Sequence, residues 1–225
     1  MRPRRAGRAW RWLGRGLSLL AVSASGTLVV SCVSVGEGEG FVQSEQLNAP
    51  ECWDAAYDLA PNFFAAEPFR DTMQIRVQRG SDLKEVSDGV TILVTSIEGV
   101  RARLGEAIEV GLPQGVSPPG VPVGCDGAPC PERLVNLALY LHQSCHNQNM
   151  VLYATEGTIT FEELFSGDPN EDDAAEKLTV ARFDVLVGDP RVLADPEVDV
   201  STAQSRLTGY FRFFFQRGQP AQPFP

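Results

Sequence analysis

Thr72-Met73-Gln74-Ile75-Arg76-Val77-Gln78 decides the fold class, because its apolar and polar side chains alternate without a break. A period of two places the apolar residues on one face of a β-strand and the polar residues on the other. The stretch Tyr210-Phe211-Arg212-Phe213-Phe214-Phe215, near the end of the chain, is expected to be an aromatic final strand with Phe211, Phe213 and Phe215 on one face. We predict that the apolar residues of these two strands face one core: Met73, Ile75, Val77, Phe211, Phe213 and Phe215.

Further strand signals lie at 90–97, 107–112, 150–154, 158–164, 177–187 and 206–216. The segment 132–147 allows two interpretations. Pro131 and the spacing of Leu134, Ala138 and Leu141 suit a helix, whereas 135–142 alternates as a strand does, and we favour the strand on an all-β background. Seven or eight short strands separated by loops predict an all-β protein built as a single antiparallel β-sandwich domain.

The first 31 residues have the pattern of an export signal. Arginines crowd the start of the chain, and a mostly apolar run covers residues 17–30. The run is too short to span a bilayer, which requires ~20 apolar residues. It closes on Val29-Val30-Ser31-Cys32, in which small Ser31 precedes a cysteine.

These four residues resemble the lipobox of bacterial lipoproteins. The resemblance covers residues 1–32 only and implies that the chain is cut before Cys32, which then carries the lipid. Two or three acyl chains give stable membrane anchoring where one does not. Because Val33 rather than Asp follows the cysteine, the family rule favours a place in the cell envelope at the outer membrane. We therefore expect a signal peptide at 1–31, a flexible tether at 32–51 and the β-sandwich at 52–225.

The charge of the mature chain narrows the classes of partner that we expect it to bind. All 29 acidic residues, but only 13 of the 19 basic ones, follow residue 31. A strongly acidic chain is poorly suited to nucleic acid, whose phosphates attract positive patches. We expect contact with the membrane through the lipid, no nucleic acid, no cofactor and an envelope protein as a possible partner.

Four cysteines remain after Cys32, and an even number in an exported chain indicates two disulfides with three possible pairings. Asp-Gly-Ala-Pro separates Cys125 from Cys130 and favours a turn that brings these two cysteines together. That choice pairs Cys52 with Cys145. The proline-rich and glycine-rich stretch 113–131, which holds the first pair, is expected to be a long loop.

Two histidines flank Cys145 in His142-Gln-Ser-Cys-His146, which leaves a metal site open as the alternative. Its ligands would come from Cys125, Cys130, His142, Cys145 and His146, since structural zinc prefers Cys and His in sets of four. Oxidation to disulfides competes with such a site after export. The chain has neither a nucleophile elbow nor a His-Glu-x-x-His motif, and it offers no residue that we would name as catalytic.

The remaining candidate is a binding surface. If Phe211, Phe213 and Phe215 face the core, then Tyr210, Arg212 and Phe214 lie on the opposite face of the last strand. An aromatic side chain on such a face indicates either a surface groove or partner contact, or burial of the strand on both sides. We therefore expect a lipid-anchored envelope protein with a non-catalytic binding or structural role. The alternative is a metal-binding module or a metal-dependent enzyme that uses the Cys/His cluster around His142 and His146.

Overall fold

The computed structural model describes residues 38–50, 52–80, 87–112, 133–145, 148–193, 195 and 197–215. The expected signal peptide and lipidation site lie outside these residues, as does the whole of the expected loop at 113–131. Val33–Pro225 forms a compact unit of its own, to which the described residues belong.

The described residues are mostly β-strand. The strands are β1 (Gly38–Ala49), β2 (Trp53–Leu59), β3 (Phe63–Phe69), β4 (Thr72–Gln78), β5 (Gly89–Val94), β6 (Ala107–Glu109), β7 (Val135–Cys145), β8 (Gln148–Glu163), β9 (Leu178–Gly188) and β10 (Gln204–Phe214). Two short helices, α1 (Ile97–Arg101) and α2 (Pro190–Leu193), and 3-10 turns at Ala174–Glu176 and Val200–Thr202 complete the order.

The strands form one sheet in the order β2-β1-β10-β9-β8-β7-β5-β4-β3, and β6 adds to β8. Every pairing between these named strands is antiparallel. The predicted antiparallel all-β class is therefore confirmed. The two separate sheets of a sandwich are not, because the hydrogen bonds run without interruption from β2 to β3.

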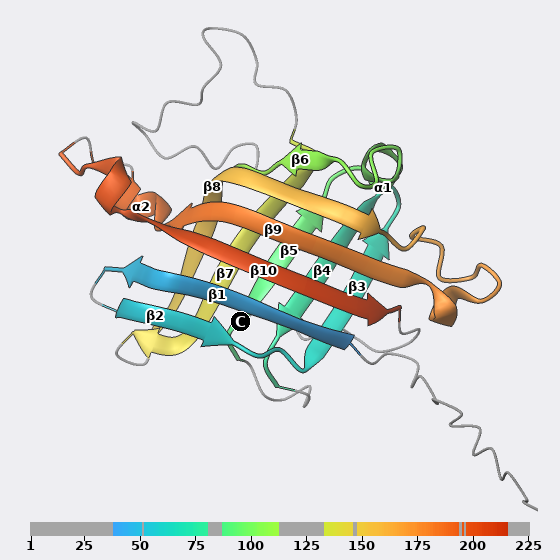
Figure 1. Cartoon of the computed structure of the whole chain (residues 1–225), viewed down its shortest axis with the longest axis horizontal. Helices are drawn as coiled ribbons and strands as arrows, with labels where there is room; N and C mark the ends of the chain where they lie inside the picture. Colours follow the sequence, from blue (N-terminus) through green and yellow to red (C-terminus); the bar gives the residue numbers. More distant parts are fainter. Residues whose placement is uncertain are drawn as a thin grey trace, which may run out of the picture. The chain divides into compact units, whose positions relative to one another are not determined.

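The sheet curls until its two edges approach each other. Its edge strands, β2 and β3, are joined by residues 60–62 alone, and four Cα–Cα steps of 3.8 Å reach at most ~15 Å. Figure 1 shows β1, β2, β9 and β10 in front of β3, β4, β5 and β7. The two layers touch through Phe64 and Phe213, whose stacked ring centroids lie 5.9 Å apart.

Strand β8 forms the corner that connects the layers. Its first part pairs with β7 and its second part with β9, and its register against β9 shifts twice, at Ala154/Glu156 and at Phe161/Glu163. Such bulges bend a strand and increase its twist. Gly157, between the two shifts, has φ +117°, a conformation that residues with a side chain rarely adopt.

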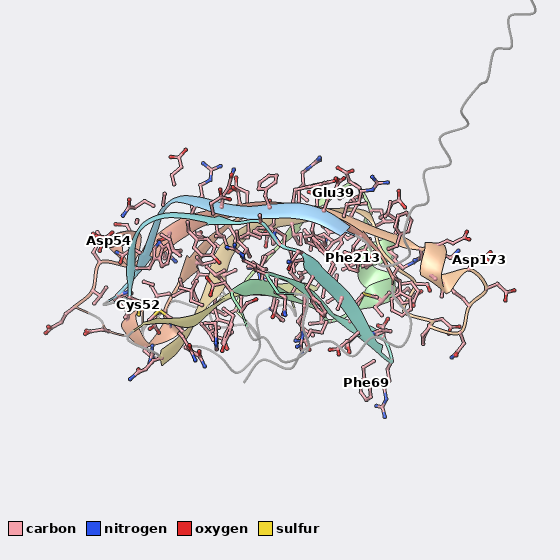
Figure 2. All side chains as sticks on the ribbon, turned by 90° about the horizontal axis from the view of Figure 1, so that it is seen from below. Glu39, Cys52, Asp54, Phe69, Asp173 and Phe213 are labelled. Atoms are coloured by element: carbon pink, nitrogen blue, oxygen red, sulfur yellow. The ribbon has the colours of Figure 1, made fainter. Side chains whose placement is uncertain are left out.

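The predicted core is confirmed. Figure 2 shows side chains filling the space between the layers. One contiguous cluster includes all six residues predicted from the alternation: Met73, Ile75, Val77, Phe211, Phe213 and Phe215. The inward-facing residues of both layers thus share one interior, as expected for a curled sheet with a period of two.

The predicted tether is wrong for residues 38–49, which form β1. This strand pairs with β10 on one side and with β2 on the other, so the folded domain begins before residue 52. Val42, Leu47 and Ala49 are buried in the core. The strand was not predicted because its sequence is largely polar and a register shift between Ser44 and Leu47 interrupts the alternation of its side chains.

The ambiguous segment 132–147 contains strand β7, as favoured from the sequence. Several strand boundaries differ from the prediction, and the strand expected at 107–112 ends at Glu109. The strand expected at 90–97 ends at Val94, because Ser96 caps α1 by accepting a hydrogen bond from the Gly99 N–H at 3.0 Å. The two strands expected at 150–154 and 158–164 are the single strand β8. In the described part of the chain, no helix is long and apolar enough to cross a membrane.

Candidate functional site

The outer face of β10 carries the three residues predicted for binding. Phe211 and Phe213 are buried on the inner face, whereas Tyr210 and Phe214 are half-buried and Arg212 is exposed on the outer face. The structure therefore places these three side chains where the alternation predicted them. Because β10 lies between β1 and β9, outer side chains of three strands meet around them.

The structure adds an aromatic neighbour that the sequence analysis missed. Phe41 of β1 lies directly across from Tyr210, with ring centroids 6.4 Å apart and planes tilted by 33°. Phe41 is 41% exposed, an unusual exposure for a phenylalanine in the middle of a strand. On the other side of Tyr210, the directly opposed residue is Arg182 of β9. An aromatic pair and a guanidinium thus form one row across three strands.

Three ion pairs surround this row. Arg182 donates to Glu162 at 2.8 Å, Arg206 donates to Asp184 at 2.8 Å, and Arg212 lies 3.7 Å from Glu39. The Arg206 hydrogen bonds hold the pKa of Asp184 below its ordinary value. Exposed pairs of this kind contribute little to stability. Their effect is that arginines balance carboxylates on this face, although the chain as a whole is strongly acidic.

We call this surface the β10 face and define it by Phe41, Tyr210, Arg212, Phe214 and Arg182. Exposed aromatic rings offer apolar area at low entropic cost, and arginine adds planar donors for carboxylate, phosphate or carbonyl groups. Aromatic and arginine residues are also enriched among the residues that dominate binding energies. The exposed rings and guanidinium groups of the β10 face are together suited to binding a partner molecule.

A hollow of about 730 Å³ adjoins the β10 face. It lies at the β1 bulge, and Gln43, Arg206 and Thr208 line it together with residues of β2. Its acidic lining residues are Glu45, Asp54 and Asp58. The bulge therefore adds a polar depression beside the aromatic row.

The Cys/His alternative is placed only in part. His142 lies near the end of β7, and its backbone N–H donates a hydrogen bond to the Asp88 carboxylate at 2.7 Å. Its ring stacks with that of Tyr140, with the ring centroids 6.3 Å apart. Cys125, Cys130 and His146 lie outside the described residues, as does the side chain of Cys145. Among the residues that are described, no three His, Cys, Asp or Glu side chains are grouped to hold a metal ion.

Asp88 forms a second contact that sequence analysis missed. Its carboxylate accepts a hydrogen bond from the Tyr57 hydroxyl at 3.5 Å, which connects edge strand β2 to the turn before β5. Burial raises the pKa of Asp88, and burial together with the Asp88 charge raises the pKa of Tyr57 well above its ordinary value. We interpret this contact as structural, because it bridges the two layers where the sheet edges approach.

Cys52 is the one cysteine whose side chain the structure describes, and it is disulfide-bonded. It lines a hollow of about 690 Å³ together with Gln148 of β8. Gln148 in turn pairs with Cys145 in the β7–β8 register. The pairing of Cys52 with Cys145 stays a prediction, because the side chain of Cys145 lies outside the described residues.

Comparison with known proteins identifies no relative. No family model, no curated protein and no solved structure matches the chain. The functional argument therefore depends on the leader sequence and on the geometry of the β10 face.

Proposed function

We propose that this protein is a lipid-anchored protein of the cell envelope, held at the outer membrane through Cys32, with a non-catalytic binding role. The β10 face is its binding surface. The observation that carries the proposal is the exposed Phe41 ring beside Tyr210, flanked by guanidinium groups on a charge-balanced face. In this proposal the two layers of the curled sheet act as a sandwich, a rigid support for the outer side chains.

The anchor has its own prediction. Replacing Cys32 with alanine is expected to abolish lipid attachment, because the thiol is the acceptor of the lipid in the lipobox class. Metabolic labelling with a radioactive fatty acid measures the attachment directly. Ser34→Ala is a matched control that removes another small polar side chain close by and retains the label. Label that persists on the Cys32→Ala variant contradicts the anchor.

The binding surface has a second prediction. A photo-crosslinking residue at Phe41 is expected to give an adduct of defined mass with one envelope component, whereas the same residue at Leu93 of β5 gives none. Leu93 is a matched control, since it is 38% exposed and Phe41 is 41% exposed. Tyr210→Ser is expected to weaken capture at Phe41 at least about tenfold, because truncating an aromatic anchor costs ≥2 kcal/mol.

Two controls make this experiment decisive. Tyr210→Phe keeps the ring and is expected to keep the adduct, which separates loss of stacking from loss of folding. The mass of the adduct distinguishes a protein partner from a polysaccharide. Equal labelling at positions 41 and 93 would show that the β10 face is not selective and would refute the proposed binding surface.

A further inference from the structure

The turn between β3 and β4 exposes an aromatic side chain that no packing explains. Phe69 is 69% exposed, the most exposed large apolar side chain among the described residues. Arg70 follows it with φ +57°, and its guanidinium carbon lies 5.3 Å from the centre of the Phe69 ring. A phenylalanine and an arginine therefore project together from the tip of a two-residue turn.

The tip is held in place by the rest of the domain. The Asp71 carbonyl accepts a hydrogen bond from the Ile97 N–H at 2.7 Å, and its carboxylate accepts one from the Ser96 hydroxyl at 2.9 Å. The Thr72 hydroxyl donates to the Phe69 carbonyl at 2.8 Å. Helix α1 therefore braces the turn, so that Phe69 is presented on a fixed base.

This tip lies toward the same end of the domain as the start of β1. A Cβ at Gly38, the first residue of β1, would meet the Phe64 ring at 2.5 Å, so β1 begins beside β3. Five residues of strand, roughly 17 Å, separate Phe64 from Phe69. Figure 2 shows Phe69 at the end of the domain opposite Cys52 and Asp54.

The short connection to the anchor limits how far the start of β1 can lie from the membrane. Six residues lead from Cys32 to Gly38, and they reach at most about 22 Å when fully extended. With Cys32 in a bilayer, the first residue of β1 must stay within this distance of the bilayer surface. Asp54 lies at the opposite end of the domain from Phe69 and can therefore be further from the anchor.

We propose that Phe69 and Arg70 dock into the interfacial region of the membrane that carries the anchor, as a second contact beside the lipid. This inference rests on the proposed lipidation of Cys32. The phenyl ring enters the boundary between headgroups and acyl chains, and the guanidinium binds phosphate oxygens. Because the acidic loop Asp168–Asp173 lies at the same end, the contact favours zwitterionic over anionic lipid.

The test places a fluorescent reporter at the tip. Trp53 is the only tryptophan after residue 31, so a Trp53→Phe background allows a single indole to be introduced by Phe69→Trp. The mature chain is attached to vesicles of phosphatidylethanolamine and phosphatidylcholine by an N-terminal histidine tag and a nickel-chelating lipid. This attachment replaces the natural anchor. Failure of Cys32 lipidation and failure of the docking contact are therefore distinguished.

Brominated acyl chains in the vesicles report depth by quenching the indole. The Phe69→Trp protein is expected to lose at least about half its fluorescence, because interfacial side chains lie roughly 5–10 Å into the headgroup and acyl boundary. Ala55→Trp, at an exposed position in the far end of the domain, is the matched control and is expected to keep its fluorescence. Adding Arg70→Glu to Phe69→Trp is expected to reduce the quenching. Equal quenching at positions 69 and 55, or none at 69, overturns the proposal.

Discussion

Replacing Phe213 with alanine is expected to lower the free energy of unfolding by about 3–5 kcal/mol, the usual cost of truncating a buried phenylalanine. Phe213 is 1% exposed, and it contacts the rings of Phe64 in one layer and of Phe211 on its own strand. Loss of its ring opens a cavity where the two layers meet. Equilibrium unfolding in urea, followed by circular dichroism, measures the change.

Phe214 is the matched control for this prediction. It is the next residue on the same strand, but it is half-buried on the outer face. Phe214→Ala is expected to cost clearly less, since only part of its ring leaves water on folding. If Phe213→Ala does not fold, Phe213→Leu retains most of the volume and gives a smaller, measurable loss. Equal losses at 213 and 214 would contradict the assignment of the two faces.

Loss of the disulfide at Cys52 is expected to destabilise the protein comparably. With Cys145 as the partner, the bond closes a loop of roughly ninety residues, for which the chain-entropy model gives ~4–5 kcal/mol before any discount for strain. Both Cys52→Ser and Cys145→Ser should shift the urea midpoint to lower concentration by similar amounts. The double variant should add little, because either substitution already removes the same bond.

The second cysteine pair, Cys125 and Cys130, which lie close together in the sequence, supplies the control. A bond between Cys125 and Cys130 closes a short loop, so Cys125→Ser is expected to cost less than Cys52→Ser. Peptide mapping without reduction identifies the pairs directly. A peptide that links Cys130 to Cys145 would refute the proposed pairing. Four free thiols on freshly purified protein would revive the metal alternative with His142 and His146.

The missed strand β1 has consequences for the candidate site. The sequence around Gly36-Glu-Gly-Glu-Gly40 predicts a solvated acidic linker, and no aromatic neighbour of Phe41 is visible nearby in the chain. In the fold, Phe41 lies against Tyr210, about 170 positions further along the chain. Three of the five residues of the β10 face were therefore predicted from sequence, whereas Phe41 and Arg182 required the pairing of β1 and β9 with β10.

The sequence by itself determined those features that depend on neighbouring residues. Alternation over Thr72–Gln78 and over 210–215 identified strands, the side of each strand that faces the core, and the antiparallel all-β class. This succeeds because successive side chains of a strand point to opposite faces, so that burial leaves a period of two in the chain. The prediction of a leader before Cys32 also depends on neighbouring residues alone, since its signal is contiguous.

Only the tertiary structure decided which strands pair and how the sheet closes. The β1–β10 pair joins the two ends of the domain, and the curl depends on the bulges of β8 at Ala154/Glu156 and Phe161/Glu163. Ladder hydrogen bonds join backbone groups that every residue carries, so they leave little trace of the partner in the local sequence. One continuous curled sheet and two stacked sheets also require the same alternation of side chains. The choice between them lies in contacts between residues far apart in the chain.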